Sequence, residues 1–218
     1  MLNILCKISF FIMLSASVSI TQAESTDQTS QDVVSDVQSL YRQWADIRYQ
    51  QKSEEREAMF ESLREEAARL TGAHPKDAEL WIWRGIINST YAGEVGGLSA
   101  LSVIKEAKKN LEMALELDAS ALSGSAFTSL GVLYYQVPGW PLSFGDDDEA
   151  EEFLKKGLII NPKGIDSNFF YADFLINQGR KKEARGYLEI AESAADRIDR
   201  PVADKGRRSE IAELKARL

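Results

Sequence analysis

Apolar residues recur at helical spacing along most of the chain from residue 31 onward. Phe127, Leu130, Gly131 and Tyr134 follow one another at steps of three, one and three positions, which places them on one side of a helix. The same spacing returns over residues 150–158. No segment alternates apolar and polar residues with a period of two, so we expect no strands. The pattern predicts an all-α protein.

Short breaks rich in glycine, proline or asparagine divide this helical pattern into pairs of helices. The predicted pairs cover residues 31–75, 77–119, 124–162 and 164–195. Pro75, Ala119 and Pro162 mark equivalent ends, 44 and 43 positions apart, which indicates an internal repeat. Because a stack of repeats must cover its last apolar face, we predict that residues 203–218 form a C-terminal capping helix.

An irregular segment, Val137–Asp148, interrupts the third pair. Pro138 and Pro141 within it cannot continue a helix, because proline lacks an amide proton and restricts the residue before it. The segment also carries two large aromatic residues, Trp140 and Phe144. They either fold back over the helix pair as a plug or form an apolar lip for a ligand or partner, and the sequence leaves both readings open.

The first residues have the pattern of a secretory signal peptide. A lysine precedes the apolar run Ile8–Ile20, and a small residue ends the segment at the expected cleavage point, so residues 1–23 are the predicted signal. Residues 24–30 are polar and are expected to form a flexible spacer before a helical domain at 31–218. The apolar run is too short to span a bilayer, and no later segment is more apolar. We therefore expect a periplasmic protein with no membrane span in its mature chain.

Composition argues against several kinds of chemistry. Cys6, the single cysteine, lies in the predicted signal peptide, and His74 is the single histidine, so we expect no zinc site and no cysteine nucleophile. The acidic cluster Asp146–Glu149 stands at a helix start, where carboxylates cap free amides, and is not expected to bind a metal. A net charge of −8 without a basic run argues against nucleic acid as a partner. We expect no catalytic residues and no cofactor, and hence a protein that is not an enzyme.

Small residues recur where paired helices must approach closely. They are Gly85, Gly131 and Ala172 on first helices, and Ala107, Ala150 and Ala184 on second helices. This pattern resembles the tetratricopeptide repeat over residues 77–195, with the best match at 177–188 (NQGRKKEARGYL). The two earlier units depart from the family period because loops are inserted between their helices. The resemblance implies a right-handed α-solenoid of helix hairpins with inserted loops and a C-terminal capping helix.

Three segments point to a narrower group within that family. They read VPGWPLSFGDDDEAEEFL at 137–154, YADFLINQGR at 171–180 and ADKGRRSEI at 203–211. They are similar to the T-component proteins associated with TRAP-type (tripartite ATP-independent periplasmic) transporters. This resemblance implies a secreted helical protein that partners a periplasmic solute-binding subunit and forms a homotrimer.

The resemblance to the tetratricopeptide repeat places the first helix of each pair on the inner, concave wall of the solenoid. The expected contact residues on this wall and its loops are Asn88, Tyr91, Tyr134, Trp140, Phe144, Asn168 and Tyr171. The favoured function is a non-enzymatic periplasmic scaffold that binds another envelope protein, such as a TRAP-type solute-binding subunit. The alternative is a carrier of a small apolar ligand in a pocket or pore between helices, with residues 137–144 as its lid.

Overall fold

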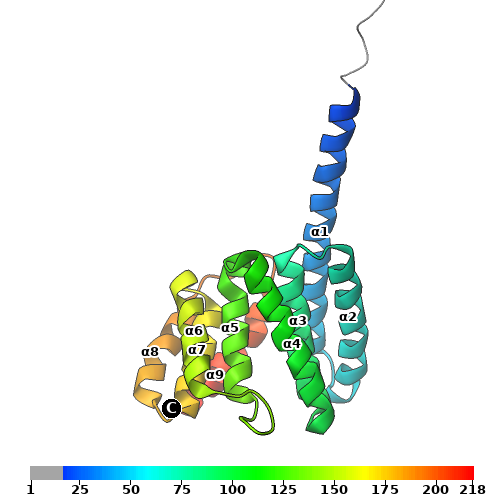
Figure 1. Ribbon diagram of the computed structural model, residues 1–218. Coiled ribbons are helices and arrows are strands. Elements are labelled where there is room, and N and C mark those ends of the chain that lie inside the picture. The colour runs from blue at the N-terminus through cyan, green and yellow to red at the C-terminus, as the bar shows by residue number, and fades with distance from the viewer. Residues whose placement is uncertain (1–16) are drawn as a thin grey trace, which may run out of the picture. The chain divides into compact units, whose positions relative to one another are not determined.

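The computed structural model describes residues 17–218, with side-chain surroundings described from residue 31 (Figure 1). Most of the predicted signal peptide, residues 1–16, lies outside this range. The first helix, α1 (Ser17–Gln50), includes residues 24–30, which the sequence analysis expects as a spacer. The chain divides into a short N-terminal unit, Met1–Ser35, and a compact body, Asp36–Leu218. All packing described below belongs to the compact body.

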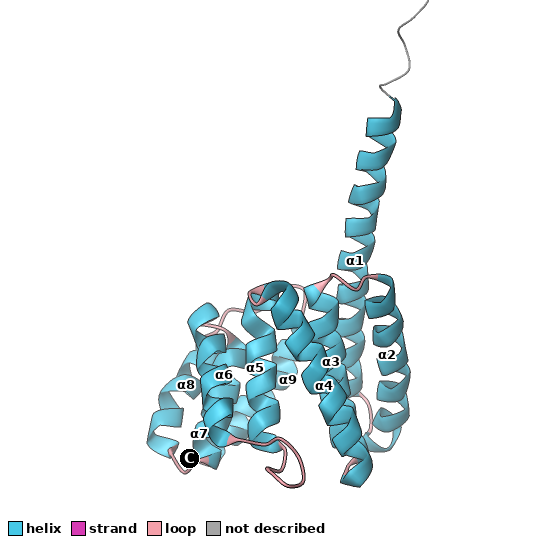
Figure 2. Cartoon of the chain, viewed as in Figure 1, coloured by secondary structure: helices cyan, strands magenta, loops and turns pink. Residues whose placement is uncertain are grey.

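The part of the chain that the structure describes is helical throughout, with loops and turns between helices and no strand (Figure 2). This confirms the predicted all-α class. After α1 come α2 (Ser53–Ala73), α3 (Ala78–Val95), α4 (Gly97–Asp118), α5 (Ala121–Gln136), α6 (Asp147–Ile160), α7 (Ile165–Asn177), α8 (Lys181–Ser193) and α9 (Pro201–Ala216). Within residues 17–218 no helix is apolar over enough length to cross a bilayer.

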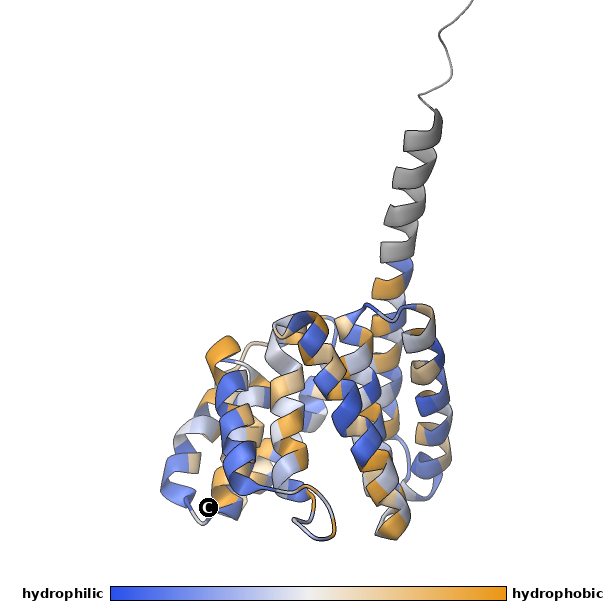
Figure 3. Ribbon diagram, in the orientation of Figure 1, coloured by the Kyte–Doolittle hydropathy of each residue, from blue (hydrophilic) through white to orange (hydrophobic). Residues whose placement is uncertain are grey.

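Helices that follow one another in the chain pack together, and the odd-numbered helices also contact one another. Helix α3 packs on α4, α5 on α6 and α7 on α8, while α3 contacts α5, α5 contacts α7 and α7 contacts α9. The odd-numbered helices therefore form one continuous row. The even-numbered helices flank it, and hydrophilic residues dominate the visible turns of α2 and α6 (Figure 3).

Close contact within two of the pairs depends on glycine. A Cβ added at Gly85 in α3 would lie 2.6 Å from Cγ of Leu111 in α4, and one at Gly131 in α5 would lie 2.5 Å from Cγ of Leu154 in α6. Both distances are shorter than a carbon–carbon contact allows. The recurring small residues of the sequence thus occur where two helix axes come nearest.

The start of α6 shows why its acidic residues are present. The Asp146 side chain accepts hydrogen bonds from the backbone amides of Asp148 and Glu149, at 3.0 and 3.1 Å. This is the capping role expected of the acidic cluster, and it satisfies amides that have no partner within the helix.

Helix α9 joins the two ends of the compact body. It packs on α7 and α8, and side-chain hydrogen bonds also join it to α1. The Tyr49 hydroxyl and the Arg48 guanidinium both donate to the Glu210 carboxylate, at 3.2 and 3.3 Å. Gly206 lies against the Tyr49 ring, where no side chain would fit. Contact between α9 and α1 was not expected from the sequence.

Candidate functional site

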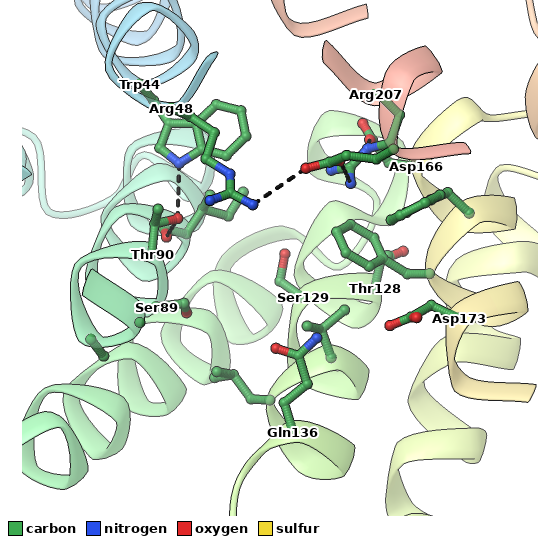
Figure 4. A pocket seen from close by; sticks show the side chains of 18 of the residues that line it. Trp44, Arg48, Ser89, Thr90, Thr128, Ser129, Gln136, Asp166, Asp173 and Arg207 are labelled. Atoms are coloured by element: carbon green, nitrogen blue, oxygen red, sulfur yellow. Dashed lines mark hydrogen bonds and ion pairs between the residues drawn. The ribbon is translucent and has the colours of Figure 1, made fainter. Parts of the chain in front are cut away.

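A cavity of about 920 Å³ lies among the odd-numbered helices, with part of α4 and the start of the 137–146 loop completing its wall (Figure 4). Its lining comes from α1, α3, α5, α7 and α9, so it depends on the α9–α1 contact as well as on the row of odd-numbered helices. The volume is in the range of pockets that hold small molecules, roughly 300–1,000 Å³.

One face of each odd-numbered helix supplies the lining. In α3, Trp83, Ile86 and Thr90 recur at steps of three and four positions and all line the cavity. Helix α5 supplies Ser125, Ser129, Val132 and Gln136, and α7 supplies Asp166, Phe169, Phe170 and Asp173. Because these sets follow the helical period, each helix presents one side to the cavity and another to its paired helix.

Tryptophans cover the wall formed by α1 and α3. The Trp44 and Trp83 rings are 5.9 Å apart between centroids. The Trp44 indole N–H donates to the Thr90 hydroxyl at 2.9 Å, which fixes α1 against α3 (Figure 4). Trp83 is 5% exposed. Aromatic faces of this kind provide a large contact area with little conformational freedom to lose.

The opposite wall carries a network of arginines and carboxylates. Asp166 accepts a hydrogen bond from Arg197 Nη1 at 2.7 Å and another from Arg207 Nε at 2.8 Å. Burial raises the pKa of the Asp166 carboxyl, but the charges and hydrogen bonds of Arg207 and Arg197 outweigh it and lower this pKa to about 2. Arg207 also lies 4.4 Å from the ring centroids of Phe169 and Phe170. These ion pairs hold α9 against α7.

A third set of charged side chains lines the cavity near the C-terminal end of α3. Arg56 Nε lies 3.4 Å from the Glu94 carboxylate and Arg48 Nη1 lies 3.9 Å from it. Arg48 also pairs with Glu210 at 3.3 Å. Arg48 of α1 therefore connects a carboxylate on α3 with another on α9, and Arg56 of α2 pairs with the first of them.

The chemistry that the cavity offers is that of a binding site. Apolar side chains (Ile86, Leu101, Ile104, Val132 and Leu133) and aromatic rings share the lining with arginines, carboxylates and hydroxyls. Among the residues that the structure describes, no three His, Cys, Asp or Glu side chains are grouped as metal ligands. His74, the single histidine of the chain, is at the end of α2 and is not in the lining.

None of the seven contact residues expected from the sequence lines this cavity. On α3, Asn88 is buried and its side-chain oxygen accepts from Arg64 Nε at 2.7 Å. The Arg64 guanidinium also lies 4.5 Å from the Tyr91 ring centroid. Both residues therefore face α2, on the side of α3 away from the Trp83 stripe.

On α7 the two expected residues are structural. Asn168 is fully buried and donates to the backbone carbonyls of Pro162 and Gly164, at 3.1 and 2.8 Å. Tyr171 is 3% exposed, and its hydroxyl donates to Glu151 at 2.9 Å, which joins α7 to α6. The cavity is lined instead by Phe169 and Phe170, on the other side of the same helix.

The three remaining residues separate into two groups. The Phe144 ring lies 5.3 Å from the Tyr134 ring, and Tyr134 stacks on Phe153 of α6 at 5.4 Å. Trp140, in contrast, is 90% exposed. Phe144 therefore packs on the helix pair, as the plug alternative expects, whereas Trp140 is exposed to solvent.

Sequence reasoning missed the basic segment that leads into α9. Arg197, Arg200 and Arg207 all line the cavity, and the acidic residues that pair with Arg197 and Arg207 come from α9 and α7. A signal was available, since arginines at steps of three and seven positions lie on one side of the chain as it enters a helix. The sequence alone does not show that this side faces a cavity. That becomes clear only from the structure, in which α9 contacts both α7 and α1.

No protein-family model matches this sequence, and no curated protein matches it significantly. The likeness to tetratricopeptide repeats therefore depends on the residues quoted in the sequence analysis.

Proposed function

We propose that this protein is a non-enzymatic, exported binding protein that holds a small amphipathic molecule in the cavity among its odd-numbered helices. The observation that carries the proposal is the lining, in which apolar and aromatic surface meets the buried Arg207 and the partly buried Arg197 and Arg200 in one space of about 920 Å³. Such a space suits a ligand with an apolar body and a polar end. This develops the carrier function, in which the inter-helix pocket holds a largely apolar ligand.

The proposal includes the fold family and the location. The row of contacts from α3 through α5 and α7 to α9 supports a solenoid of tetratricopeptide-like hairpins, because equivalent helices of successive repeats pack side by side in such an array. The signal pattern of residues 1–23 supports export to the periplasm. In this proposal the solenoid differs from an open one because its last helix returns to its first.

Exposed apolar side chains support a second candidate function, the docking of another envelope protein. Trp140 and Leu142 are 90% and 63% exposed, and they follow Val137 and Pro138, which line the cavity. Leu98, which is 84% exposed, follows Gly97 of the lining in the same way. Aromatic side chains dominate the energetics of protein interfaces. A periplasmic solute-binding subunit of a TRAP-type transporter is the partner that the T-component resemblance suggests, and association into a homotrimer is part of the same suggestion.

Native mass spectrometry of protein purified from exporting cells tests the cavity function. We expect a retained small molecule in the wild-type protein and its loss in Ser129→Phe, which places a ring in the cavity. Ser62→Phe is the matched control, because Ser62 is exposed on α2. Wild-type protein without any retained mass, and without binding to any of a panel of amphiphiles, would contradict the proposal.

Trp140→Ser distinguishes the docking function. If an envelope protein copurifies with the wild-type chain and is lost in this variant while the small molecule is retained, docking and ligand binding are separate functions. If a partner copurifies equally with both proteins, the exposed loop is not its docking site.

A further inference from the structure

Two hydrogen-bond donors of the cavity wall have no acceptor among the residues that the structure describes. The first is the indole N–H of Trp83, whose nitrogen is fully buried and has no hydrogen-bond partner within that part of the chain. A buried N–H without an acceptor is costly, and nearly all such groups in folded proteins are paired. The neighbouring Trp44 shows the usual case, since its N–H donates to Thr90.

The second is the guanidinium of Arg200, which lies 5.5 Å from the Trp83 ring centroid and 4.6 Å from that of Tyr41. Within residues 17–218 no acceptor takes a hydrogen bond from it. The nearest carboxylate oxygen, Oδ2 of Asp199, is 3.8 Å from Nε and already accepts from the Tyr41 hydroxyl at 2.8 Å. Arg200 thus has aromatic partners but no close anionic one.

The two neighbouring arginines of the lining, Arg197 and Arg207, do have close carboxylate partners. Arg197 and Arg207 each lie within 2.8 Å of a carboxylate oxygen of Asp166. Burial lowers the pKa of Arg200 and the charge of Arg197 lowers it further, which agrees with a cation that the protein compensates incompletely.

We propose that Arg200 and Trp83 together bind the carboxylate of an amphipathic organic acid in the cavity. The proposal rests on the proposed function and specifies its ligand class. A carboxylate has two oxygens, one for the guanidinium and one for the indole N–H, so it would satisfy both donors at once. A phosphate monoester would bring nearly two negative charges to one cation that already has Asp199 3.8 Å away, and is less well matched.

The rest of the lining provides space for the apolar part of such an acid. Ile86 of α3, Leu101 and Ile104 of α4, and Val132 of α5 all line the cavity beyond the arginine wall. An alkyl chain buried against these side chains binds more tightly with each methylene that is removed from water. The ligand expected is therefore a monocarboxylic acid with a long apolar chain.

Isothermal titration calorimetry with three probes of equal chain length tests the proposal. The probes are dodecanoate, dodecanol and dodecyl phosphate. We expect the wild-type protein to bind dodecanoate at least about tenfold more tightly than dodecanol, the contribution of charge-assisted hydrogen bonds. Dodecyl phosphate binding as tightly as dodecanoate would overturn the choice of a carboxylate.

Two variants locate the carboxylate. Arg200→Gln should lose the preference for dodecanoate over dodecanol, and Trp83→Phe, which keeps a ring but removes the N–H, should reduce it several-fold. Lys205→Gln is the matched control, because this lysine is exposed on α9 and its loss changes the net charge equally. Equal loss of preference in Lys205→Gln would show a general charge effect and overturn the assignment.

The outcomes also separate this proposal from the proposed function. If dodecanol and dodecanoate bind equally, and Arg200→Gln changes neither, the cavity holds amphiphiles but the carboxylate site is wrong. If none of the three probes binds the wild-type protein, both proposals fail. Should Arg200→Gln not fold, as circular dichroism would show, Trp83→Phe still decides the matter.

Discussion

The Tyr41 hydroxyl donates a hydrogen bond of 2.8 Å to Asp199, although 158 positions separate the two residues. Tyr41 is in α1, and Asp199 is in the segment that enters α9. Burial raises the pKa of the Tyr41 hydroxyl and the bond to Asp199 raises it further, so the tyrosine stays protonated and remains a donor. Together with the bonds from α1 to Glu210, this contact closes the wall of the cavity.

The first prediction concerns the energy of that contact. In a double-mutant cycle of Tyr41→Phe and Asp199→Asn, we expect a coupling of about 0.5–1.5 kcal/mol in the free energy of unfolding, because one partly buried hydrogen bond is removed. Urea unfolding followed by circular dichroism measures it. Strictly additive effects would mean that the contact contributes nothing to holding α9 on α1.

The second prediction uses glycines on α9 and α8. Gly206→Ala should destabilise the protein by about 1–3 kcal/mol, because the added methyl group would overlap the Tyr49 ring. The hydroxyl of that ring is held by its hydrogen bond to Glu210, and burial raises the pKa of the hydroxyl to about 12.

Gly186→Ala is the control for this substitution. Gly186 has no atom within 4 Å of an added Cβ, so the variant should be more stable by roughly 0.5–1 kcal/mol through helix propensity. The same urea experiment compares the two. Stabilisation by both alanines would contradict the close approach of α9 and α1.

The third prediction concerns acid. The folded-state pKa of Asp166 is lowered from 3.8 to about 2, and that of Glu151, mainly through its hydrogen bond from Arg180, from 4.5 to about 2. A lowered folded-state pKa means that the stabilising contribution is complete above the unfolded-state value and is lost as the pH falls through the folded-state value. We therefore expect the free energy of unfolding to fall between about pH 4.5 and 2.

Asp166→Asn should be less stable at pH 7, since Arg207 and Arg197 lose their shared partner, and should show a shallower decline in acid. Urea unfolding at a series of pH values, with carbon NMR of the side-chain carboxyls, checks both points. An identical pH dependence in wild type and variant would show that Asp166 is not among the groups responsible.

The fourth prediction separates the two aromatic residues of the 137–146 loop. Phe144→Ala should cost about 1–3 kcal/mol, because the ring packs on Tyr134 and fills space that nothing else would occupy. Trp140→Ala should change stability by less than about 0.5 kcal/mol, since the side chain is exposed. Thermal unfolding of the two variants measures both changes in stability. A large loss of stability in Trp140→Ala would mean that this side chain packs against the protein in solution.

The helices were predictable because their signals are local. Periodic apolar residues, Pro75 and Pro162 at breaks, and the acidic start of α6 each act over a few positions, so the all-α class could be predicted from them. The small residues also indicated where paired helices approach, as Gly85 and Gly131 now show.

The cavity was less accessible to sequence reasoning because each odd-numbered helix has two apolar faces. Asn88 and Trp83 lie on the same helix, and the pattern alone does not say which of them faces the neighbouring helix and which faces inward. The cavity exists because α9 contacts α1. This contact depends on pairs such as Tyr41 and Asp199, which are 158 positions apart in the sequence and therefore leave no local pattern. Arg200 was missed for the same reason.

The return of α9 has a consequence for how the molecule is made. Synthesis proceeds from the N-terminus, and every earlier helix can pair with the one before it as it emerges. The cavity gains its last wall only when residues 197–217 have folded against α1, so a chain halted at Ala195 would have its earlier helix pairs but would lack this wall. Under the proposed function, the capacity to retain a guest molecule is therefore acquired at the final step of assembly.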